Sequence, residues 1–262
     1  MKETTSRVGP IWTYLAAALT AIIGIGSLAV FGQFLSTGGA RWADMQMDWG
    51  GALAWDAALC LIFFLQHSGM VRRPFRSWLT RFAPAHTHGA LYTLASAAAL
   101  VLLSLGWRPS RIEVYGVNGA ARELLRGLGL LSLVGFAWTF AVLRDFDTFG
   151  ARALLSRLRR DERCSWPLTI RGPYRWVRHP LYFFGLVLMW ACPTLSLDRL
   201  LFNILFSGWI VAGAKLEERD LVAEFGEAYR AYQRVVPMLL PRRLPRPAAH
   251  LPAERPELQS TT

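Results

Sequence analysis

Charged residues are scarce in this chain, and long stretches contain none. Only 18% of the 262 residues are charged and 53% are hydrophobic, whereas a soluble domain usually has about 25% charged residues. Residues 11–35, 91–107 and 200–214 contain no Asp, Glu, Lys or Arg. A bilayer core about 30 Å thick needs about 20 mostly apolar residues per helix. The composition therefore argues against an ordinary soluble domain and predicts an integral membrane protein.

Cysteine is also rare, and its three copies form no recognisable site. Cys60, Cys164 and Cys192 show no CxxC spacing and no histidine partner at the spacing of metal ligands. A structural zinc site or a disulfide framework would show such a pattern. The GxGxxG fingerprint of dinucleotide-binding folds is absent as well. We therefore expect no metal and no Rossmann domain.

Six apolar segments predict an all-α polytopic membrane protein with about five or six transmembrane helices. The segments are residues 12–35, 51–67, 90–107, 124–143, 181–195 and 200–214. The first is too long for the apolar core of a secretory signal, so we expect it to remain as a span. The last two have about 15 residues each and are joined by "PTLSLD". This spacing predicts a short helical hairpin.

The net charge of +11 comes largely from arginines in the loops between these segments. "RRPFRSWLTR" follows the second segment and the stretch 144–178 is rich in arginine, while the loops at 41–48 and 198–199 are nearly neutral. Positively charged loops stay on the cytoplasmic side of a membrane. We therefore expect the lipid bilayer as a partner and both termini in the cytoplasm. We expect no nucleic-acid partner, because the chain has neither a binding motif nor a basic stripe on a folded domain.

Two charged motifs flank the predicted hairpin. "RGPYRWVRHP" brings three arginines and His179 directly before an apolar run, and "KLEERDLVAEFGEAYRAYQRVVPMLLP" begins with Glu217 and Glu218 after the last one. The spacing of apolar residues in the second motif predicts an amphipathic helix. Because the open ends of a hairpin meet, we expect both motifs to lie together at the cytoplasmic surface. The alternative is that the arginines only anchor the topology and the glutamates only begin a solvated helix.

These motifs resemble a known family. "GPYRWVRHPLYFFG" followed by "EERDLVAEFGEAYRAYQRVVPMLLP" is similar to the carboxy-terminal signature of the isoprenylcysteine carboxyl methyltransferase superfamily, over about 70 residues. "FFLQHSGMVRRPFRSWLTRFAP", "LYTLASAAALVLLSLGWRP" and "LRDFDTFGARALL" resemble the branch of NnrU-like proteins and bacterial thiol methyltransferases. We therefore expect residues 1–170 to form N-terminal spans and loops, and 171–241 a cofactor-binding region. Residues 242–262, rich in proline and polar residues, are expected to be a disordered tail.

The resemblance implies a bacterial inner-membrane enzyme that uses S-adenosyl-L-methionine to methylate a small thiol, methanethiol, to dimethyl sulfide. It implies alternatives too: methylation of a prenylcysteine carboxylate or a lipid amine, or a non-catalytic NnrU-type membrane protein. The family's cofactor pocket is formed by its RHPxY block and paired glutamates. Carried over to this chain, the cofactor-binding residues are Tyr174, Arg178, His179, Pro180, Tyr182, Glu217 and Glu218. A cationic side chain can bind the carboxylate of the cofactor, and a side-chain carboxylate can accept from its ribose hydroxyls. Aromatic rings can contact its adenine and its sulfonium.

A thiol substrate must ionise before it attacks a methyl group, so a base or a positive field near it helps. His67 and Arg72 lie at a predicted cytoplasmic end of a span and are the catalytic candidates, with His179 as the alternative base. His67 would otherwise be a hydrogen-bonded histidine at a helix end. Asp145 and Asp147 fit either a helix cap or a role near the substrate.

Overall fold

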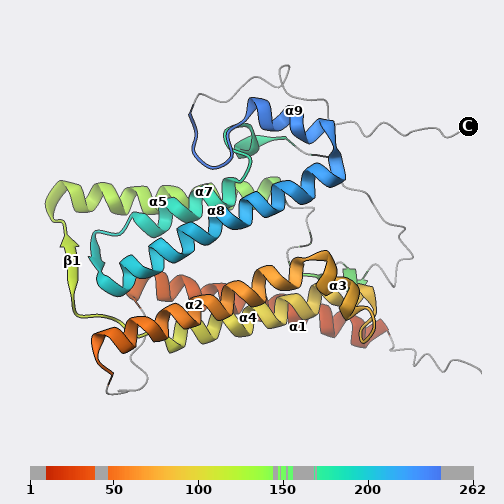
Figure 1. Cartoon of the computed structure of the whole chain (residues 1–262), viewed down its shortest axis with the longest axis horizontal. Coiled ribbons are helices and arrows are strands. Elements are labelled where there is room, and N and C mark those ends of the chain that lie inside the picture. The colour runs from red at the N-terminus through yellow and green to blue at the C-terminus, as the bar shows by residue number, and fades with distance from the viewer. Residues whose placement is uncertain are drawn as a thin grey trace, which may run out of the picture. The chain divides into compact units, whose positions relative to one another are not determined.

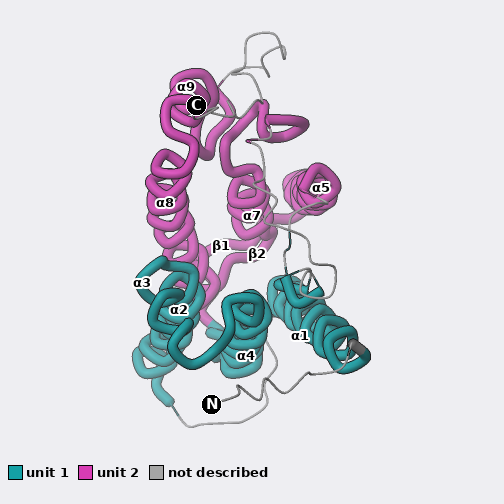
Figure 2. The backbone as a smooth tube through the Cα atoms, turned by 90° about the vertical axis from the view of Figure 1, so that its right-hand side faces the viewer, with its two compact units in different colours: residues 1–111, 146–163 teal, residues 112–145, 164–262 magenta. Residues whose placement is uncertain are grey.

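The computed structural model describes residues 10–38, 47–143, 147, 149–151, 153–155, 168 and 170–242. The chain divides into two compact units, residues 1–111 with 146–163 and residues 112–145 with 164–262 (Figure 2). Within the described ranges, five helices are long and apolar enough to cross a membrane. They are α1 (Pro10–Thr37), α2 (Trp49–Val71), α4 (His88–Gly106), α5 (Gly119–Val142) and α8 (Leu197–Phe225). The prediction of an all-α polytopic membrane protein is confirmed.

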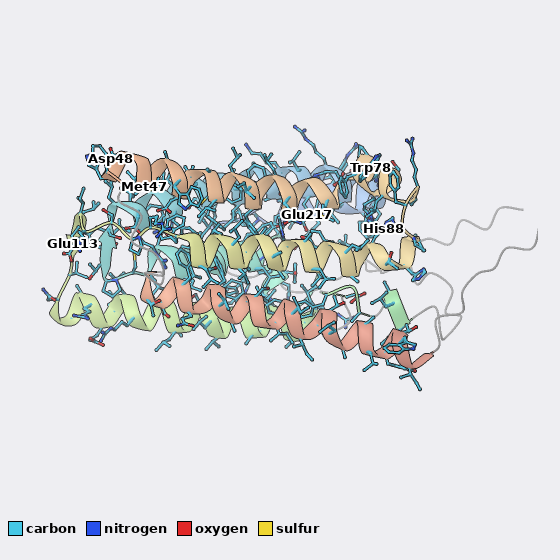
Figure 3. All side chains as sticks on the ribbon, turned by 90° about the horizontal axis from the view of Figure 1, so that it is seen from below. Met47, Asp48, Trp78, His88, Glu113 and Glu217 are labelled. Carbon is cyan, nitrogen blue, oxygen red and sulfur yellow. The ribbon has the colours of Figure 1, made fainter. Side chains whose placement is uncertain are left out.

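The first unit is built around α4, which contacts both α1 and α2 (Figure 1). Asp48 precedes α2 and accepts a hydrogen bond from the backbone N–H of Gly51 at 3.1 Å, which satisfies one of the free donors at the helix start (Figure 3). Arg72 ends α2 in an extended conformation, and Pro74 lies in the first turn of the short helix α3 (Arg73–Leu79). A 3₁₀ turn, Ala85–Thr87, then leads into α4.

Helix α1 buries several small and hydroxyl residues and exposes most of its large apolar residues. Ala17 and Thr20 are buried, whereas Leu19 and Ile22 are exposed. The hydroxyl of Thr20 donates to the carbonyl of Ala16 at 2.8 Å, so this polar group is satisfied within its own helix. In water such an arrangement would be unfavourable, but lipid tails cover exposed leucine and isoleucine without cost. The pattern supports a bilayer around this helix.

The second unit contains the predicted hairpin. Its elements are β1 (Glu113–Gly116), α5, a 3₁₀ turn (Gly172–Arg175), α7 (Pro180–Trp190), β2 (Thr194–Ser196), α8 and α9 (Glu227–Val235). Helix α7 packs against both α5 and α8, and Figure 2 shows it between them. Gly135 on α5 permits the close approach of α7, because a Cβ atom there would lie 2.2 Å from the ring of Phe184.

The limits of the hairpin differ from the prediction at both arms. The first arm ends at Trp190 instead of residue 195, since Pro193 cannot donate within a helix and the next residues pair with β1 as an antiparallel ribbon. The second arm runs to Phe225 instead of residue 214, because no helix-breaking residue interrupts "KLEERDLVAEF". The break comes at Gly226, whose φ of +57° suits glycine. The amphipathic segment is therefore shared between the end of α8 and the separate helix α9.

The predicted functional boundary near residue 170 stays a prediction. Helix α5 precedes that boundary in sequence but belongs to the same compact unit as residues 171–242. The predicted tail lies outside the described residues from 243 onward.

Candidate functional site

The hairpin brings Arg178 and Glu218 to the same end of the second unit, although 40 residues separate them in the chain. Helix α7 is 11 residues long and rises about 16 Å, and the six residues that follow add at most about 20 Å when extended. The return along α8 from Leu197 to Glu218 covers about 32 Å. The two paths therefore have similar lengths. The length of α7 and of the strand that follows it thus brings Glu218 on α8 level with Arg178.

A buried ion pair forms the centre of the site. The Nε atom of Arg178 donates to Oε1 of Glu218 at 2.6 Å, and the two side chains are only 9% and 12% exposed. Nη1 of Arg178 also donates to the backbone carbonyls of Gln233, at 3.1 Å, and Val236. The other carboxylate oxygen of Glu218 accepts from Nε2 of Gln233 at 2.9 Å. A buried pair is stabilising only when further hydrogen bonds support it, and both Arg178 and Glu218 make such bonds here.

The segment after α9 closes over this pair through the backbone. The N–H of Arg178 donates to the carbonyl of Pro237 at 2.9 Å, and the N–H of His179 donates to the carbonyl of Met238 at 3.2 Å. Arg178 therefore joins α8, the end of α9 and the chain beyond it. Pro180 follows as the first residue of α7, where its missing N–H removes no helical hydrogen bond.

His179 faces both glutamates of the pair "EE". Its Nε2 lies 3.3 Å from Oε1 of Glu218, and its Nδ1 lies 3.6 Å from Oε2 of Glu217. The imidazole also stacks on the ring of Tyr182, with centroids 5.3 Å apart and an interplanar angle of 15°. The hydroxyl of Tyr182 donates to Oε2 of Glu217 at 2.9 Å. Glu217 is 47% exposed, so it is the carboxylate of this group that a ligand can reach.

Burial lowers the pKa of His179 below its ordinary value of 6.5, and the two glutamates offset part of that effect. The imidazole is therefore neutral at neutral pH and has one nitrogen that donates and one that accepts. Burial also raises the pKa of Tyr174, so its hydroxyl stays protonated. The site thus presents neutral rings beside an accessible carboxylate.

The turn before α7 is held by aromatic residues. The hydroxyl of Tyr232 on α9 donates to the backbone carbonyl of Tyr174 at 2.5 Å. The ring of Trp176 meets Trp138 of α5 edge to face, with centroids 5.5 Å apart. Gly172 has a φ of +53°, and a Cβ atom there would lie 2.9 Å from Val142. These contacts fix the path of the chain into Arg178.

The predicted catalytic residues His67 and Arg72 lie in the first unit. His67 is half-buried near the end of α2 and contacts the hydroxyls of Tyr92 and Ser96 on α4. Arg72 lies at the junction of α2 and α3. Asp147 accepts from the backbone N–H of Ala153 at 2.9 Å, which favours the helix-cap interpretation, while Asp145 lies outside the described residues.

Two of the three cysteines lie in the part of the chain that the structure describes. Cys60 is buried and Cys192 partly buried, both as free thiols, while Cys164 lies outside the described residues. No group of three or more His, Cys, Asp or Glu side chains in those residues could hold a metal ion.

Comparison with known sequences identifies the family. The sequence model of the family described as "NnrU protein" matches residues 57–234, which is more than half of the chain. The chain belongs to the NnrU family. The match includes all nine predicted site residues, from His67 to Glu218.

Named relatives of this NnrU-family chain include several methyltransferases. It is 38% identical over 240 residues to a methanethiol S-methyltransferase of Pseudomonas sp., covering 88% of this chain and 87% of that protein. A methanethiol S-methyltransferase of Mycobacterium tuberculosis is 35% identical over 193 residues, covering 73% and 79%. Nurim of Rattus norvegicus is 27% identical over 179 residues, covering 65% and 68%. No solved structure matches the chain.

Some residues of the site were missed by the sequence analysis. Gln233 bonds Glu218, and the carbonyls of Val236, Pro237 and Met238 accept from Arg178 and His179. Backbone carbonyls carry no side-chain signature, so their role could not be read from residue types. The proline-rich end "VVPMLLP" was the available signal, because it predicts a chain that leaves its helix at this point.

Proposed function

We propose that this protein is a membrane methyltransferase that uses S-adenosyl-L-methionine to methylate methanethiol, giving dimethyl sulfide. The observation that carries the proposal is the similarity to a methanethiol S-methyltransferase over 88% of this chain and 87% of that relative. The second unit adds a site whose chemistry suits a zwitterionic, aromatic methyl donor.

The side chains of the site fit the chemical groups of S-adenosyl-L-methionine. Its ribose hydroxyls need an accessible acceptor, and Glu217 is 47% exposed. Its adenine and sulfonium favour aromatic faces, which Tyr182 and the stacked His179 provide. Tyr174 and Pro180 shape the turn that presents these rings.

Arg178 and Glu218 have structural contacts in addition to the cofactor-binding role that the sequence predicts. Of the five N–H donors of the Arg178 guanidinium, the described residues already use three, on Glu218, Gln233 and Val236. At most two are left for the donor's carboxylate. We therefore assign this pair chiefly to holding the hairpin and α9 together, so that Glu217 and His179 keep their places.

S-adenosyl-L-methionine supplies an electrophilic methyl carbon when it is bound. The protein then has to hold that carbon in line with the incoming sulfur and keep water out, and both effects lower the barrier of such a displacement. The neutral His179 suits a donor with a sulfonium, since a second cation beside it would repel it.

The arginines in the loops support the proposed location. The loop after α2 contains Arg72, Arg73, Arg76 and Arg81, and the turn before α7 contains Arg171, Arg175 and Arg178. The loop follows two long helices and the turn follows four. If each long helix crosses the bilayer once, both segments face the same side, and their positive charge favours the cytoplasm. We propose a bacterial inner membrane with both termini and the donor site cytoplasmic.

Headspace gas chromatography on the purified protein tests the function. Protein in lipid nanodiscs is given S-adenosyl-L-methionine with methanethiol and, in parallel reactions, with a prenylcysteine or phosphatidylethanolamine. Dimethyl sulfide above a control without protein is the expected result. If a methylated prenylcysteine or lipid forms instead, that molecule and not methanethiol is the acceptor. No product and no donor binding, measured by calorimetry on the same sample, would contradict the proposal and favour a non-catalytic NnrU-type protein.

A further inference from the structure

The short helix α3 and the turn after it connect two long helices of the first unit. Helix α2 ends at Val71 and α4 begins at His88, and both are long and apolar enough to cross a membrane. These two helices contact each other, so residues 72–87 are held at both ends by neighbouring spans. Figure 1 shows α3 at the end of α2, and Figure 3 shows Trp78 and His88 at the same end of the unit. The connecting segment therefore lies at a membrane surface.

Helix α3 separates its aromatic residues from its arginines. The backbone N–H groups of residues 80–83 donate to carbonyls three or four residues earlier, so the helical path continues beyond Leu79. At about 100° of rotation per residue, the aromatic residues at 75, 78 and 82 fall within about 60° of one another around the axis. The arginines at 73, 76 and 81 point about 90° or more away from the centre of that aromatic face. We call this set the α3 surface, which consists of Arg73, Phe75, Arg76, Trp78, Arg81 and Phe82.

The aromatic rings of the α3 surface stack on one another and remain exposed. The ring centroid of Trp78 lies 5.3 Å from that of Phe75 and 5.1 Å from that of Phe82. Trp78 is 48% exposed and Phe82 is 72% exposed. Contact of such rings with water is unfavourable, whereas tryptophan is enriched at the interface between membrane and water. The position of these rings at the end of a span therefore suits the headgroup layer.

The arginines of the α3 surface are exposed, and no acidic residue lies near them in the sequence. The chain contains no Asp or Glu between Asp56 and Glu113. Asp48 caps the other end of α2, and Asp56 accepts from the backbone N–H of Arg108 at 2.9 Å. Among the residues that the structure describes, none of the three arginines has an ion-pair partner. The α3 surface therefore carries three positive charges that a negatively charged partner can neutralise.

We propose that the α3 surface lies in the headgroup layer of the bilayer and binds anionic phospholipids. The guanidinium groups bind lipid phosphates, for which their planar donor geometry is suited. Trp78 and Phe82 reach the boundary with the acyl chains, as the apolar face of an interfacial amphipathic helix does. This inference depends on the assignment of a membrane protein and not on the proposed methyl transfer.

Hydrogen exchange on the full-length protein tests the proposal directly at this segment. Single copies are placed in nanodiscs of phosphatidylcholine and, in parallel, in nanodiscs with an equal part of phosphatidylglycerol. An arginine near an anionic surface contributes about fivefold in affinity. We therefore expect the amide hydrogens of residues 72–83 to exchange about fivefold or more slowly in the anionic discs. Equal exchange in the two kinds of disc would overturn the proposal, and this comparison needs no variant.

Two triple variants determine whether the arginines of α3 cause the difference. The first replaces three exposed residues of the α3 surface, Arg73→Gln, Arg76→Gln and Arg81→Gln. The control removes the same charge from exposed positions near Glu113 and Glu123, with Arg111→Gln, Arg122→Gln and Arg126→Gln. Only the first should lose the slower exchange of residues 72–83 in anionic discs. An effect that survives in the first variant, or that both variants lose equally, would overturn the assignment to α3.

Three conditions separate a lipid from other partners of the α3 surface. Inorganic phosphate added to phosphatidylcholine discs should not slow the exchange, and protection by free phosphate would overturn the assignment to a lipid. At 1 M salt the Debye length falls to about 3 Å, so the difference between the discs should shrink by more than half. An undiminished difference would overturn the role of charge. Protection in phosphatidylcholine discs that hold two copies would assign the surface to a second copy and overturn the proposal.

Fluorescence quenching tests the depth of the aromatic face. The chain has 11 tryptophans, so the emission of Trp78 is obtained as the difference between the wild type and Trp78→Phe. We expect phospholipids brominated near the start of their acyl chains to quench this difference emission, because the ring lies at that boundary. Difference emission that brominated lipids leave unchanged, while an aqueous quencher removes it, would place Trp78 in water and overturn the proposal.

Discussion

Replacing Glu218 by alanine tests the buried ion pair at the centre of the donor site. The carboxylate of Glu218 accepts from Arg178 at 2.6 Å and from Gln233 at 2.9 Å, and its side chain is 12% exposed. Removing it leaves a largely buried guanidinium without its counter-charge. Breaking a buried pair in this way is destabilising by about 3–5 kcal/mol. The hairpin and α9 should then lose their fixed junction.

Glu227 provides the matched control. It also pairs with an arginine, Arg234, at 2.9 Å, but the two side chains are 67% and 63% exposed. Exposed pairs contribute about 0.2–1 kcal/mol. Glu227→Ala should therefore leave the site nearly unchanged, although it removes the same functional group at a similar distance from its partner.

Calorimetric titration of S-adenosyl-L-methionine into both variants measures the difference. In Glu218→Ala, donor binding must overcome the about 3–5 kcal/mol lost with the buried pair. The affinity for S-adenosyl-L-methionine should then fall more than about 100-fold, since 1.4 kcal/mol is a factor of ten. Glu227→Ala should lose less than about fivefold. Equal losses in the two variants, or no loss in Glu218→Ala that elutes as a folded protein, would refute the reasoning from burial.

Three further outcomes follow from the same contacts. Tyr182→Phe removes the hydroxyl that donates to the exposed carboxylate of α8, and we expect donor affinity to fall about fivefold by titration, as for one hydrogen bond. Because burial lowers the pKa of His179, the folded state binds fewer protons than the unfolded state near and below the ordinary value of 6.5. The thermal midpoint should therefore fall as the pH drops from 7.5 to 5.5, and less so in His179→Gln; equal slopes would contradict this. Gly135→Ala forces a Cβ atom to 2.2 Å from Phe184, whereas Gly127→Ala on the same helix meets nothing within 4 Å. Only the first should lower the thermal midpoint, by the equivalent of about 1–3 kcal/mol.

The sequence was sufficient for the spans because their signal is local. Each long apolar run needs a helix in a bilayer, whatever its neighbours are, and the first four long helices follow the predicted segments closely. The ends of the hairpin depend on a partner that is remote in sequence. Leu195 lies in an apolar run that resembles a helix, yet it pairs with Tyr115 in the ribbon. No local pattern shows that pairing.

The candidate site divides in the same way. The meeting of the RHP motif with the paired glutamates could be inferred, because a hairpin brings its open ends together, and the ion pair of Arg178 with Glu218 realises it. The different exposure of Glu217 and Glu218 could not be inferred from the sequence. Neighbouring residues on a helix point in different directions, and only the tertiary packing decides which of them is buried. The hydroxyls that surround His67 come from α4, more than one helix away in sequence, and carried no motif.

The measurement that tests the central claim most directly uses a donor with a deuterated methyl group. Purified protein in nanodiscs is supplied with methyl-deuterated S-adenosyl-L-methionine and unlabelled methanethiol, and the headspace is analysed by gas chromatography with mass spectrometry. The account predicts dimethyl sulfide in which one methyl group is fully deuterated and the other is not. Unlabelled dimethyl sulfide, or none above the control without protein, would contradict it.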